Sequence, residues 1–402
     1  MRNFSVFPLQ WKQRGHELDA YASQADVVKA DLYWVGSARA IEQWQKRLDY
    51  DLAPSAYIGD EDVGYSGESV IISPYDENLA NKLAQGQIRL ICAEYNYDKY
   101  KEYEQFWLQR GAVLNQTFFQ AEVFWPIVQV YKKDFLCLDR IEIFLTDRCT
   151  LNCEKCLHFI PYLHTRVDTP LEQLKKDADI LFARVDYVQK LKLLGGEVFL
   201  YPHLTEYLRY LHEHYRTQIG EIRLGTNGTI LPPKDILNTC HSYGIIVDIS
   251  DYSVAVKGKY NLQECVDYFQ GCGVAVDIKR SGETWLDMGF PIAKPPTRTE
   301  EENQIHFSRC AMFCRQFAKG KLYFCCSNYA AVRAGLFPDD EDNFFDFYAE
   351  PFNKKALLEF ELGFNPKGYL SFCEYCFGGS AQNNPHEVAV AEQAQYRNEL
   401  IT

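Results

Sequence analysis

The segment TDRCTLNCEKCLHF, residues 146–159, contains three cysteines in a Cys-x3-Cys-x2-Cys spacing, namely Cys149, Cys153 and Cys156. Thiols this close in sequence fit one loop, which can hold a single inorganic cluster from one side. A four-iron, four-sulfur (4Fe-4S) cluster takes four cysteine ligands, so a loop with three leaves one iron open to another ligand. The alternatives are a zinc knuckle or scattered core thiols, although zinc sites favour close cysteine pairs and supply four ligands.

The residues around this loop alternate between strand and helix patterns. Immediately upstream, DRIEIFLTD (139–147) has apolar side chains at alternate positions, which predicts a strand that ends at the cysteines. Helical patterns such as PLEQLKKDADILFARV separate further predicted strands, at residues 190–196, 221–227, 244–250 and 274–279. This rhythm predicts half or more of a (β/α) barrel, in which catalytic groups gather at the strand C-termini.

A cysteine loop of this kind at a strand end resembles the radical S-adenosylmethionine (SAM) superfamily, whose hallmark is this spacing after the first barrel strand. The resemblance implies that SAM chelates the open iron through its amino and carboxylate groups. It also implies that an electron from the cluster splits SAM, and that the resulting 5'-deoxyadenosyl radical removes a hydrogen atom from substrate.

The ends of the later predicted strands extend the resemblance. Gly195, Gly196 and Glu197 match the family's Gly-Gly-Glu, which binds the SAM amino group. Glycine lets the backbone approach a ligand closely, and an acid can pair with an ammonium. Asn227 closes the next strand and Ser250 the one after it, which places both near the expected SAM ribose and substrate. An ordinary Asn-Gly turn and solvated loop side chains are the structural alternatives.

One position departs from the family pattern. The residue before the third cysteine is usually aromatic and touches the adenine, but here it is Lys155. We therefore expect Phe159 or Tyr162 to supply the adenine contact.

A second cysteine set lies in the last quarter of the chain. Cys310 and Cys325 flank Gly320 in a Cys-x9-Gly-x4-Cys pattern, and Cys373 and Cys376 follow as Cys-x2-Cys. This set resembles the twitch domain, the short relative of the SPASM domain, and implies a second, fully ligated 4Fe-4S cluster. KGKLYFC reads as a hairpin turn that brings one thiol back beside another. A structural zinc on the same four thiols remains open.

Two further cysteines lie beside these ligands. Cys314 and Cys326 are candidate catalytic residues, because an S–H bond is weak enough to return a hydrogen atom to a carbon radical. Most of the remaining cysteines are expected to be buried apolar thiols.

The N-terminal part has its own strand and helix alternation, which predicts a Rossmann-like open parallel sheet. Its first turn, WVGSARA, places Gly36 and Ser37 where a ligand phosphate would meet a helix N-terminus. YIGDED and GYSGESVIISPYD resemble a small Rossmann-like domain joined to enzymes of surface-glycan metabolism, which implies that Asp60 and Asp62 face a ribose. A sheet that binds nothing is the alternative.

The expected fold class is therefore α/β with three domains. These are a Rossmann-like domain at 1–135, a partial radical SAM barrel at 136–295 and a twitch/SPASM-like domain at 296–402, with a linker expected at 294–304. The net charge of −13 and the lack of a basic stripe argue against nucleic acid, and the charge is poor for anionic membranes. The N-terminus shows no apolar leader, so we expect a cytoplasmic protein.

The leading functional hypothesis is oxidation or epimerisation of a sugar, sugar nucleotide or aminocyclitol, with a flavodoxin or ferredoxin as electron donor by family habit. It comes from the glycan-type N-terminal domain and the short C-terminal cysteine domain. A peptide maturase and a non-enzymatic nucleotide-binding regulator with structural zinc are the two alternatives.

Overall fold

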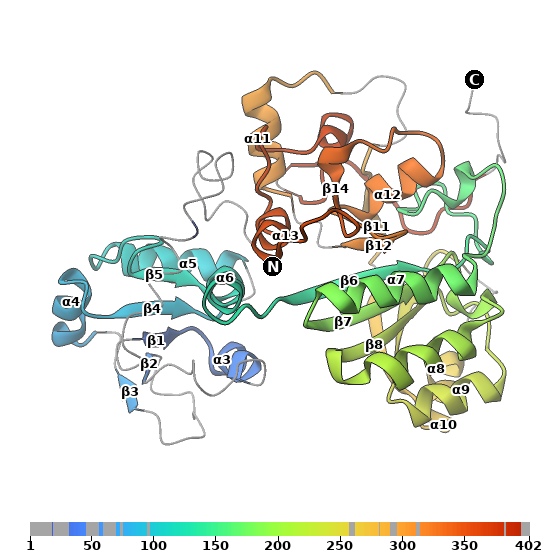
Figure 1. Ribbon diagram of the computed structural model, residues 1–402, viewed down its shortest axis with the longest axis horizontal. Coiled ribbons are helices and arrows are strands. Elements are labelled where there is room, and N and C mark those ends of the chain that lie inside the picture. Colours follow the sequence, from blue (N-terminus) through green and yellow to red (C-terminus); the bar gives the residue numbers. More distant parts are fainter. Residues whose placement is uncertain are drawn as a thin grey trace. The chain divides into compact units, whose positions relative to one another are not determined.

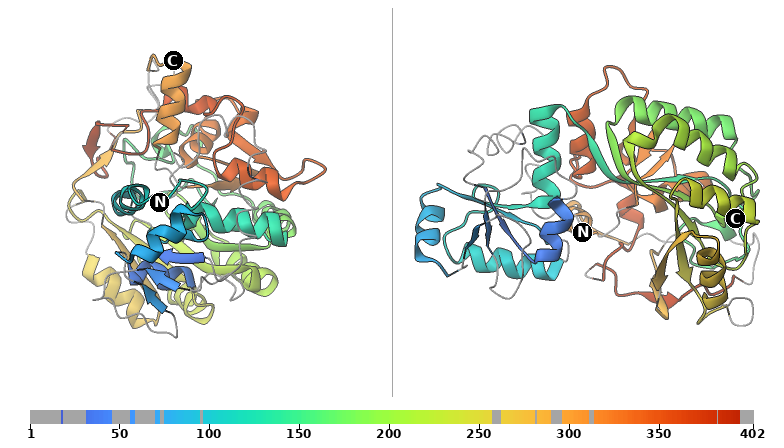
Figure 2. Two further views of the ribbon diagram at one scale, coloured as in Figure 1. Left: turned by 90° about the vertical axis from the view of Figure 1, so that its left-hand side faces the viewer. Right: turned by 90° about the horizontal axis from the view of Figure 1, so that it is seen from below.

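The computed structural model describes most of the chain and divides it into two compact units (Figures 1 and 2). One unit comprises Met1–Phe135 with Lys355–Gly368, and the other comprises Leu136–Lys354 with Tyr369–Thr402. The described residues are 18, 32–45, 56–58, 70–72, 75–94, 97–256, 262–280, 282–289, 296–310, 314–381 and 383–394. Asp60 and Asp62 lie outside them, so their ribose contact stays a prediction.

The first unit contains a five-stranded parallel sheet in the order β3-β2-β1-β4-β5. This order, in which the chain starts in the middle and proceeds first to one edge and then to the other, is that of doubly wound sheets. The strands are β1 Leu32–Val35, β2 Ala56–Ile58, β3 Val70–Ile72, β4 Arg89–Cys92 and β5 Phe118–Gln120. The helices are α3 Ala38–Gln45, α4 Glu77–Ala84, α5 Tyr97–Leu108 and α6 Ala121–Lys133.

The turn between β1 and α3 already contains an anionic partner. The backbone N–H of Ser37 donates to Oε1 of Glu94 at 2.5 Å, and Glu94 is buried behind the end of β4. A carboxylate from the chain thus occupies the helix start where the sequence suggested a ligand phosphate. This contact favours the alternative of a sheet whose first turn binds no phosphate.

The C-terminal part of the chain also contributes to this first unit. Helix α13, Lys354–Glu361, contacts α6, because Tyr131 donates its hydroxyl to Glu359 at 3.1 Å and Lys355 lies 4.3 Å from the Tyr131 ring centroid. The sequence pattern had placed residues 355–368 in the third domain, whereas they pack with the first unit. The three-domain division stays a prediction.

The second unit is built on an eight-stranded sheet in the order β10-β9-β8-β7-β6-β12-β13-β14. Strands β6 to β10 are parallel, as the strand and helix rhythm predicted. They are β6 Cys137–Phe144, β7 Tyr187–Leu194, β8 Ile219–Thr226, β9 Ile246–Asp251 and β10 Ala275–Arg280. The helices between them, drawn in green to yellow in Figure 1, are α7 Leu171–Arg184, α8 Leu204–Tyr215, α9 Lys234–Ser242 and α10 Leu262–Gly271.

Burial explains why these segments fold as they do. Ile141, Ile143 and Leu145 are each at most 1% exposed, so the alternation that predicted β6 does face a core. On α7, Leu174 and Leu181 are buried seven residues apart, as expected for one face of an amphipathic helix. Among the described residues, none of the helices has both the length and the apolar character needed to cross a bilayer.

Three C-terminal strands extend the same sheet beyond β6, namely β12 Gln316–Ala318, β13 Lys321–Tyr323 and β14 Phe344–Asp346. Strands β11 Thr284–Leu286 and β15 Glu387–Ala389 form a separate antiparallel pair, and the helices of this part are α11 Glu300–Ser308 and α12 Cys326–Arg333. Helix α11 begins at a capping box formed by Thr299 and Glu302. The linker expected at 294–304 is therefore wrong for residues 300–304, because the charged run after the two prolines starts a helix.

The hairpin that joins β12 to β13 confirms the turn predicted from KGKLYFC. Lys319 and Gly320 both have positive φ, at 53° and 71°, as a two-residue hairpin turn with left-handed central residues requires. Asp177 on α7 accepts the backbone N–H groups of both residues, at 2.9 and 3.0 Å. A Cβ at position 320 would lie 2.1 Å from the ring of Tyr348.

We predict that Gly320→Ala destabilises the second unit more than Gly335→Ala does. Both glycines have φ near +70°, so each substitution carries a backbone strain of about 1–2 kcal/mol. Only position 320 adds an overlap with a side chain, the half-exposed ring of Tyr348, which must move to make room for the methyl group. Denaturant unfolding followed by far-UV circular dichroism measures the difference. Equal unfolding midpoints for the two variants would contradict the packing described here.

Candidate active site

A cavity of about 400 Å³ lies at the C-terminal ends of the parallel strands of the second unit. Its wall includes all three cysteines of the 146–159 loop, together with Gly195, Gly196, Asn227 and Ser250. The structure therefore brings together seven of the residues predicted from sequence. The other lining residues include Lys155, His158, Lys192, Thr226, Tyr252, Trp285 and Met288.

The two glycines are required by contact with the cysteine loop itself. A Cβ on Gly195 would lie 2.7 Å from Cγ2 of Thr146, and one on Gly196 would lie 2.6 Å from both the Arg148 carbonyl oxygen and the Cys149 Cβ. The backbone N–H of Gly196 donates to the Thr146 carbonyl at 2.8 Å. Glycine was predicted at these positions because a ligand must approach the backbone closely. In the structure, the segment that approaches the two glycines closely is the cysteine loop.

Glu197 has a different place from the one predicted. It is 0% exposed and does not line the cavity. Its carboxylate accepts the Thr226 hydroxyl at 2.8 Å and the Asn227 N–H at 2.9 Å. Direct pairing with an ammonium in the cavity is not supported, because the carboxylate is used to fix the end of β8.

Two amide side chains donate toward sulfur atoms of the loop. Nδ2 of Asn227 lies 3.6 Å from Sγ of Cys149, and Nε2 of Gln393 lies 3.5 Å from Sγ of Cys153. Gln393 also accepts the N–H of Asn152 at 2.8 Å through Oε1. Hydrogen bonds to ligand sulfurs are one of the factors that set cluster potentials. No local pattern in the sequence could indicate this contact, because Gln393 lies 240 residues from Cys153.

The segment around Gln393 is a C-terminal strap, residues 387–394, which covers the outside of the cysteine loop. Strand β15 pairs with β11, and beyond it the Glu154 N–H donates to the Glu392 carbonyl at 2.7 Å. Val390 and Ala391 pack with Leu151 and Cys153. The strap therefore buries one side of the loop and keeps water from it.

Arg333 on α12 anchors the loop from another side. Its guanidinium donates to the His158 carbonyl at 2.7 Å, forms an ion pair with Asp147 at 3.1 Å and lies 3.9 Å from the Phe144 ring centroid. Residues of the C-terminal part thus complete the support of a loop that belongs to the barrel.

The chemistry of the three thiols fits a cluster. Burial raises the pKa of Cys149 to about 11 and that of Cys153 to about 12, and burial also raises the pKa of Cys156. Thiolates in this loop are therefore costly unless cations neutralise them, and iron ions supply that charge. These three residues would hold the cluster.

The four cysteines of the second set also gather at one place. Burial raises the pKa of Cys373 and Cys376, and the thiols of Cys310 and Cys325 raise both further. Two cations adjoin this four-thiol set. Arg298 donates to the Cys376 carbonyl at 2.9 Å, and the charge of Arg315 lowers the pKa of Cys325 after larger contributions from the Cys326 thiol and two backbone N–H groups.

The spacing of these sulfurs bears on the zinc alternative. Four thiolates at 2.3 Å around one tetrahedral zinc lie about 3.8 Å apart. Within the described part of the chain, the one group of three ligand atoms all within 4.8 Å of one another is Glu142, Cys314 and Cys326. No three sulfurs of the four-thiol set meet that spacing, so they are more widely spread than a single zinc requires.

Comparison with known proteins finds one relative that matches part of the sequence, and solved structures whose folds are only distantly similar. No family model matches the chain. The antilisterial bacteriocin subtilosin biosynthesis protein AlbA of Bacillus subtilis (strain 168) is 33% identical over 115 residues, which are 27% of this chain and 23% of AlbA. The chain thus spans under a quarter of the length of this curated relative.

Solved structures are similar at low TM-scores. BtrN in complex with AdoMet and 2-DOIA has a TM-score of 0.39 at 12% identity, covering 62% of this chain and 98% of BtrN. Native anSMEcpe with bound AdoMet has 0.37 at 11%, covering 58% and 84%. SuiB of Streptococcus suis bound to precursor peptide SuiA has 0.29 at 16%, covering 52% and 41%.

The chain resembles the radical SAM superfamily. The adenine contact predicted for Phe159 or Tyr162 gains no support from this geometry. Phe159 is 3% exposed and packs in a core cluster with Phe144 and Phe372, so it does not line the cavity, and Tyr162 packs beside it. Tyr252 and Trp285, whose ring centroids lie 5.4 Å apart, are the aromatic residues that do line it. No signal in the sequence indicated either residue, because Tyr252 lies just after β9 and Trp285 lies within β11, both far along the chain from the cysteine loop.

The remaining predicted residues also have defined places. Lys155, the departure from the family, lines the cavity and pairs with Asp287 at 3.1 Å. Cys314 and Cys326 do not line the cavity, so their role as hydrogen-atom donors gains no support from this geometry.

We predict that the free energy of unfolding of the protein depends on pH between about 4.5 and 7, and that Glu197→Gln removes this dependence. Burial raises the pKa of Glu197 to about 7 from its ordinary value of 4.5, against three hydrogen bonds that lower it. The folded state therefore keeps a proton that the unfolded state releases near pH 4.5. Its stability falls as pH rises from about 4.5 to about 7, by up to about 1.4 kcal/mol per pH unit. Denaturant midpoints of the metal-free protein between pH 5 and 7 measure this. The exposed Glu172→Gln should keep the wild-type slope, and an unchanged slope in Glu197→Gln would refute the assignment.

We also predict that Gln393→Met makes the reduction potential of the first cluster more negative. The substitution keeps the side-chain length but removes the N–H donor to Cys153. A redox titration followed by electron paramagnetic resonance gives the potential. Gln270→Met, at an exposed position on α10, is the matched control. A potential equal to that of wild type would show that the strap does not tune the cluster.

Proposed function

We propose that this protein is a radical SAM enzyme that holds a 4Fe-4S cluster on Cys149, Cys153 and Cys156 and binds SAM in the adjoining cavity. The observation that carries the proposal is the shared wall, in which the three thiols, Gly195 and Gly196 face one space at the strand ends. A second 4Fe-4S cluster on Cys310, Cys325, Cys373 and Cys376 is part of the proposal, supported by their convergence and spacing.

When bound, the cluster and SAM supply a 5'-deoxyadenosyl radical that removes a hydrogen atom from a substrate carbon. The chain's own residues prepare this chemistry. Gly195 and Gly196 let the end of β7 lie directly against the cysteine loop, because any side chain there would collide with it. Glu197 fixes the turn that carries Asn227. The strap excludes water from the loop. Tyr252 and Trp285 offer aromatic faces to the adenine, in the role first given to Phe159.

The substrate class that the cavity supports best is a carbohydrate-type molecule such as a sugar, a sugar nucleotide or an aminocyclitol. Lys192 lines the wall and pairs with Asp248 at 3.0 Å. His158 also lines the wall, and burial lowers its pKa to about 3, so its ring is neutral at working pH. Its buried Nδ1 has no partner among the described residues. Charged and neutral polar groups of this kind suit a hydroxylated substrate.

The reaction on that substrate is oxidation or epimerisation, with a flavodoxin or ferredoxin as electron donor. For an oxidation, Cys310, Cys325, Cys373 and Cys376 would hold a second cluster, which would supply an acceptor for the electron that the substrate radical loses. For an epimerisation, a thiol S–H, in the role predicted for Cys314 or Cys326, would give a hydrogen atom to the other face of the same carbon. The electron donor and a solvent proton would then restore the thiol from its thiyl radical.

A peptide maturase is the second candidate, and a specific observation favours it. The local match to AlbA is with a bacteriocin biosynthesis protein.

Incubation with SAM in deuterated solvent, followed by mass spectrometry, separates the candidates when sugar nucleotides and candidate peptides are supplied in parallel. Deuterium or a two-dalton loss in the sugar arm supports the carbohydrate assignment. The same change in the peptide arm alone would replace it.

We predict that the anaerobically reconstituted protein forms 5'-deoxyadenosine from SAM and dithionite, and that Cys153→Ala abolishes this. Wild type should contain about eight irons per chain and the variant about four, because one of two clusters is lost. High-performance liquid chromatography and metal analysis give both quantities. Cys272→Ala, at a thiol outside both sets, is the control. A protein with zinc and without iron would instead support the non-enzymatic regulator.

A further inference from the structure

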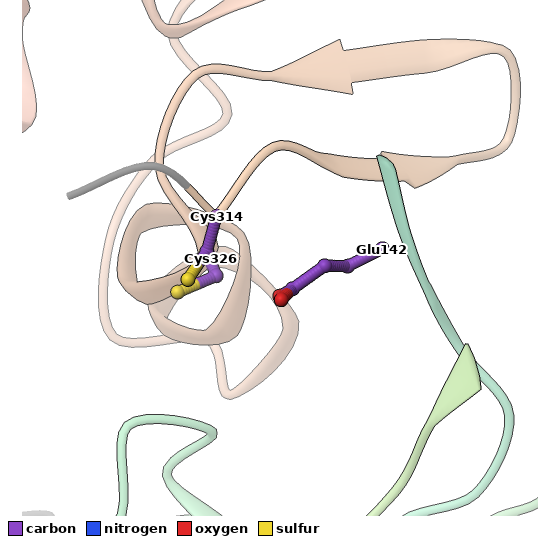
Figure 3. Close-up of side chains that lie close together, drawn as sticks. All are labelled: Glu142, Cys314 and Cys326. Atoms are coloured by element: carbon purple, nitrogen blue, oxygen red, sulfur yellow. The ribbon is translucent and has the colours of Figure 1, made fainter. Parts of the chain in front are cut away.

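A separate group of metal-ligating side chains lies between β6 and the C-terminal elements (Figure 3). Glu142 extends from β6, Cys326 begins α12, and Cys314 precedes β12 by two residues. Their ligand atoms all lie within 4.8 Å of one another. Figure 3 shows the Glu142 carboxylate directed toward the two sulfurs. None of the three belongs to the ligand sets proposed above.

Backbone pairing explains why these residues from distant segments meet. Strand β12 pairs with β6 through Gln316, whose partner is Glu142. The Glu142 N–H donates to the Arg315 carbonyl at 2.8 Å. Nε2 of Gln316 donates to the Glu142 carbonyl at 2.9 Å. Glu142 and Cys326 are each 1% exposed. The site is therefore built into the sheet and does not depend on a surface loop alone.

A divalent cation can neutralise this group once both thiols have lost their protons. Two thiolates and one carboxylate carry three negative charges, and burying them without compensation is costly. Arg140 forms an ion pair with Glu142, and its cation also lies near the thiols of Cys314 and Cys326. One arginine and one divalent cation together neutralise the group.

Buried polar atoms without partners gather in the same segments. Among the described residues, Oε1 of Gln316, Oγ of Ser327 and both side-chain atoms of Asn328 are buried and make no hydrogen bond. Gln316 lies opposite Glu142 in the sheet, and the other two follow Cys326 in the first turn of α12. Native structures rarely leave such atoms unsatisfied, so their concentration here points to a polar occupant.

We propose that Glu142, Cys314 and Cys326 bind one zinc-type divalent cation. Thiolate ligands with one carboxylate suit zinc, and three protein ligands leave a fourth position for water. Binding replaces the two thiol protons, which pass to solvent, with two metal–sulfur bonds and changes no oxidation state. The site adjoins the four-thiol set, because the Cys326 thiol is hydrogen-bonded to the Cys325 thiol as well as to that of Cys314, but it shares no ligand with that set. The inference goes beyond the proposed function, and its test does not require SAM cleavage.

The test uses the full chain, reconstituted anaerobically with iron and sulfide, exposed to zinc and then desalted. Metal analysis should find about one zinc per chain beside the iron. X-ray absorption at the zinc edge should show two sulfur ligands near 2.3 Å and oxygen ligands near 2.0 Å. The iron clusters do not interfere at this edge.

Variants separate this site from the others. Cys326→Ser and the nearly isosteric Glu142→Gln should each lose roughly tenfold or more in zinc affinity, measured by competition with a chelator, because even supporting residues of metal sites cost that much. Cys272→Ser should keep wild-type affinity. Iron content and far-UV circular dichroism show whether each variant is folded. If Cys326→Ser does not fold, the zinc affinity of Glu142→Gln alone decides the test.

Three results would overturn the proposal. The first is wild-type protein without stoichiometric zinc. The second is zinc surrounded by four sulfurs, which would place it in the four-thiol set. The third is a Cys314–Cys326 disulfide, found by mass spectrometry in protein kept free of oxygen, because it would consume two of the ligands.

Discussion

The backbone pairing between the end of β7 and the cysteine loop is the constraint on which the site depends. The Gly196 N–H binds the Thr146 carbonyl and the Glu197 N–H binds the Arg148 carbonyl, each at 2.8 Å. Side chains at 195 and 196 would separate the two segments. Because this contact fixes the loop that carries three thiols, it also fixes the cavity wall beside them. Glu197 extends the same support to β8 through Thr226 and Asn227.

The C-terminal part of the second unit completes a site that the barrel strands begin. Arg333 holds the cysteine loop from α12, and the strap around Gln393 covers its outer side. Asp177, on barrel helix α7, in turn holds the hairpin that leads to Cys325. The barrel and the cysteine-rich segment therefore support each other through hydrogen bonds in both directions. This mutual support agrees with their grouping in one compact unit.

Local patterns in the sequence predicted the parallel strands, the hairpin at Gly320 and seven residues of the cavity wall. These features depend on periodicity, turn chemistry or short spacing, all of which a single sequence displays. The sequence did not indicate the strap, Trp285 or the meeting of Glu142 with Cys314 and Cys326, because these contacts join segments far apart in the chain. Phe159 was predicted to contact the adenine, but it packs in a core, because an aromatic residue near a loop can fill a core as readily as it can contact a ligand. Glu197 was assigned to a ligand, although burial makes it a support.

The central claim is that one iron beside Cys149, Cys153 and Cys156 binds SAM in the cavity. Electron-nuclear double resonance on the dithionite-reduced protein, with SAM labelled at its amino nitrogen and carboxylate, tests this directly. The account predicts hyperfine coupling from both labels to the reduced cluster of the wild-type protein. Absence of both couplings in protein that contains its full iron, with SAM present at saturation, would contradict it.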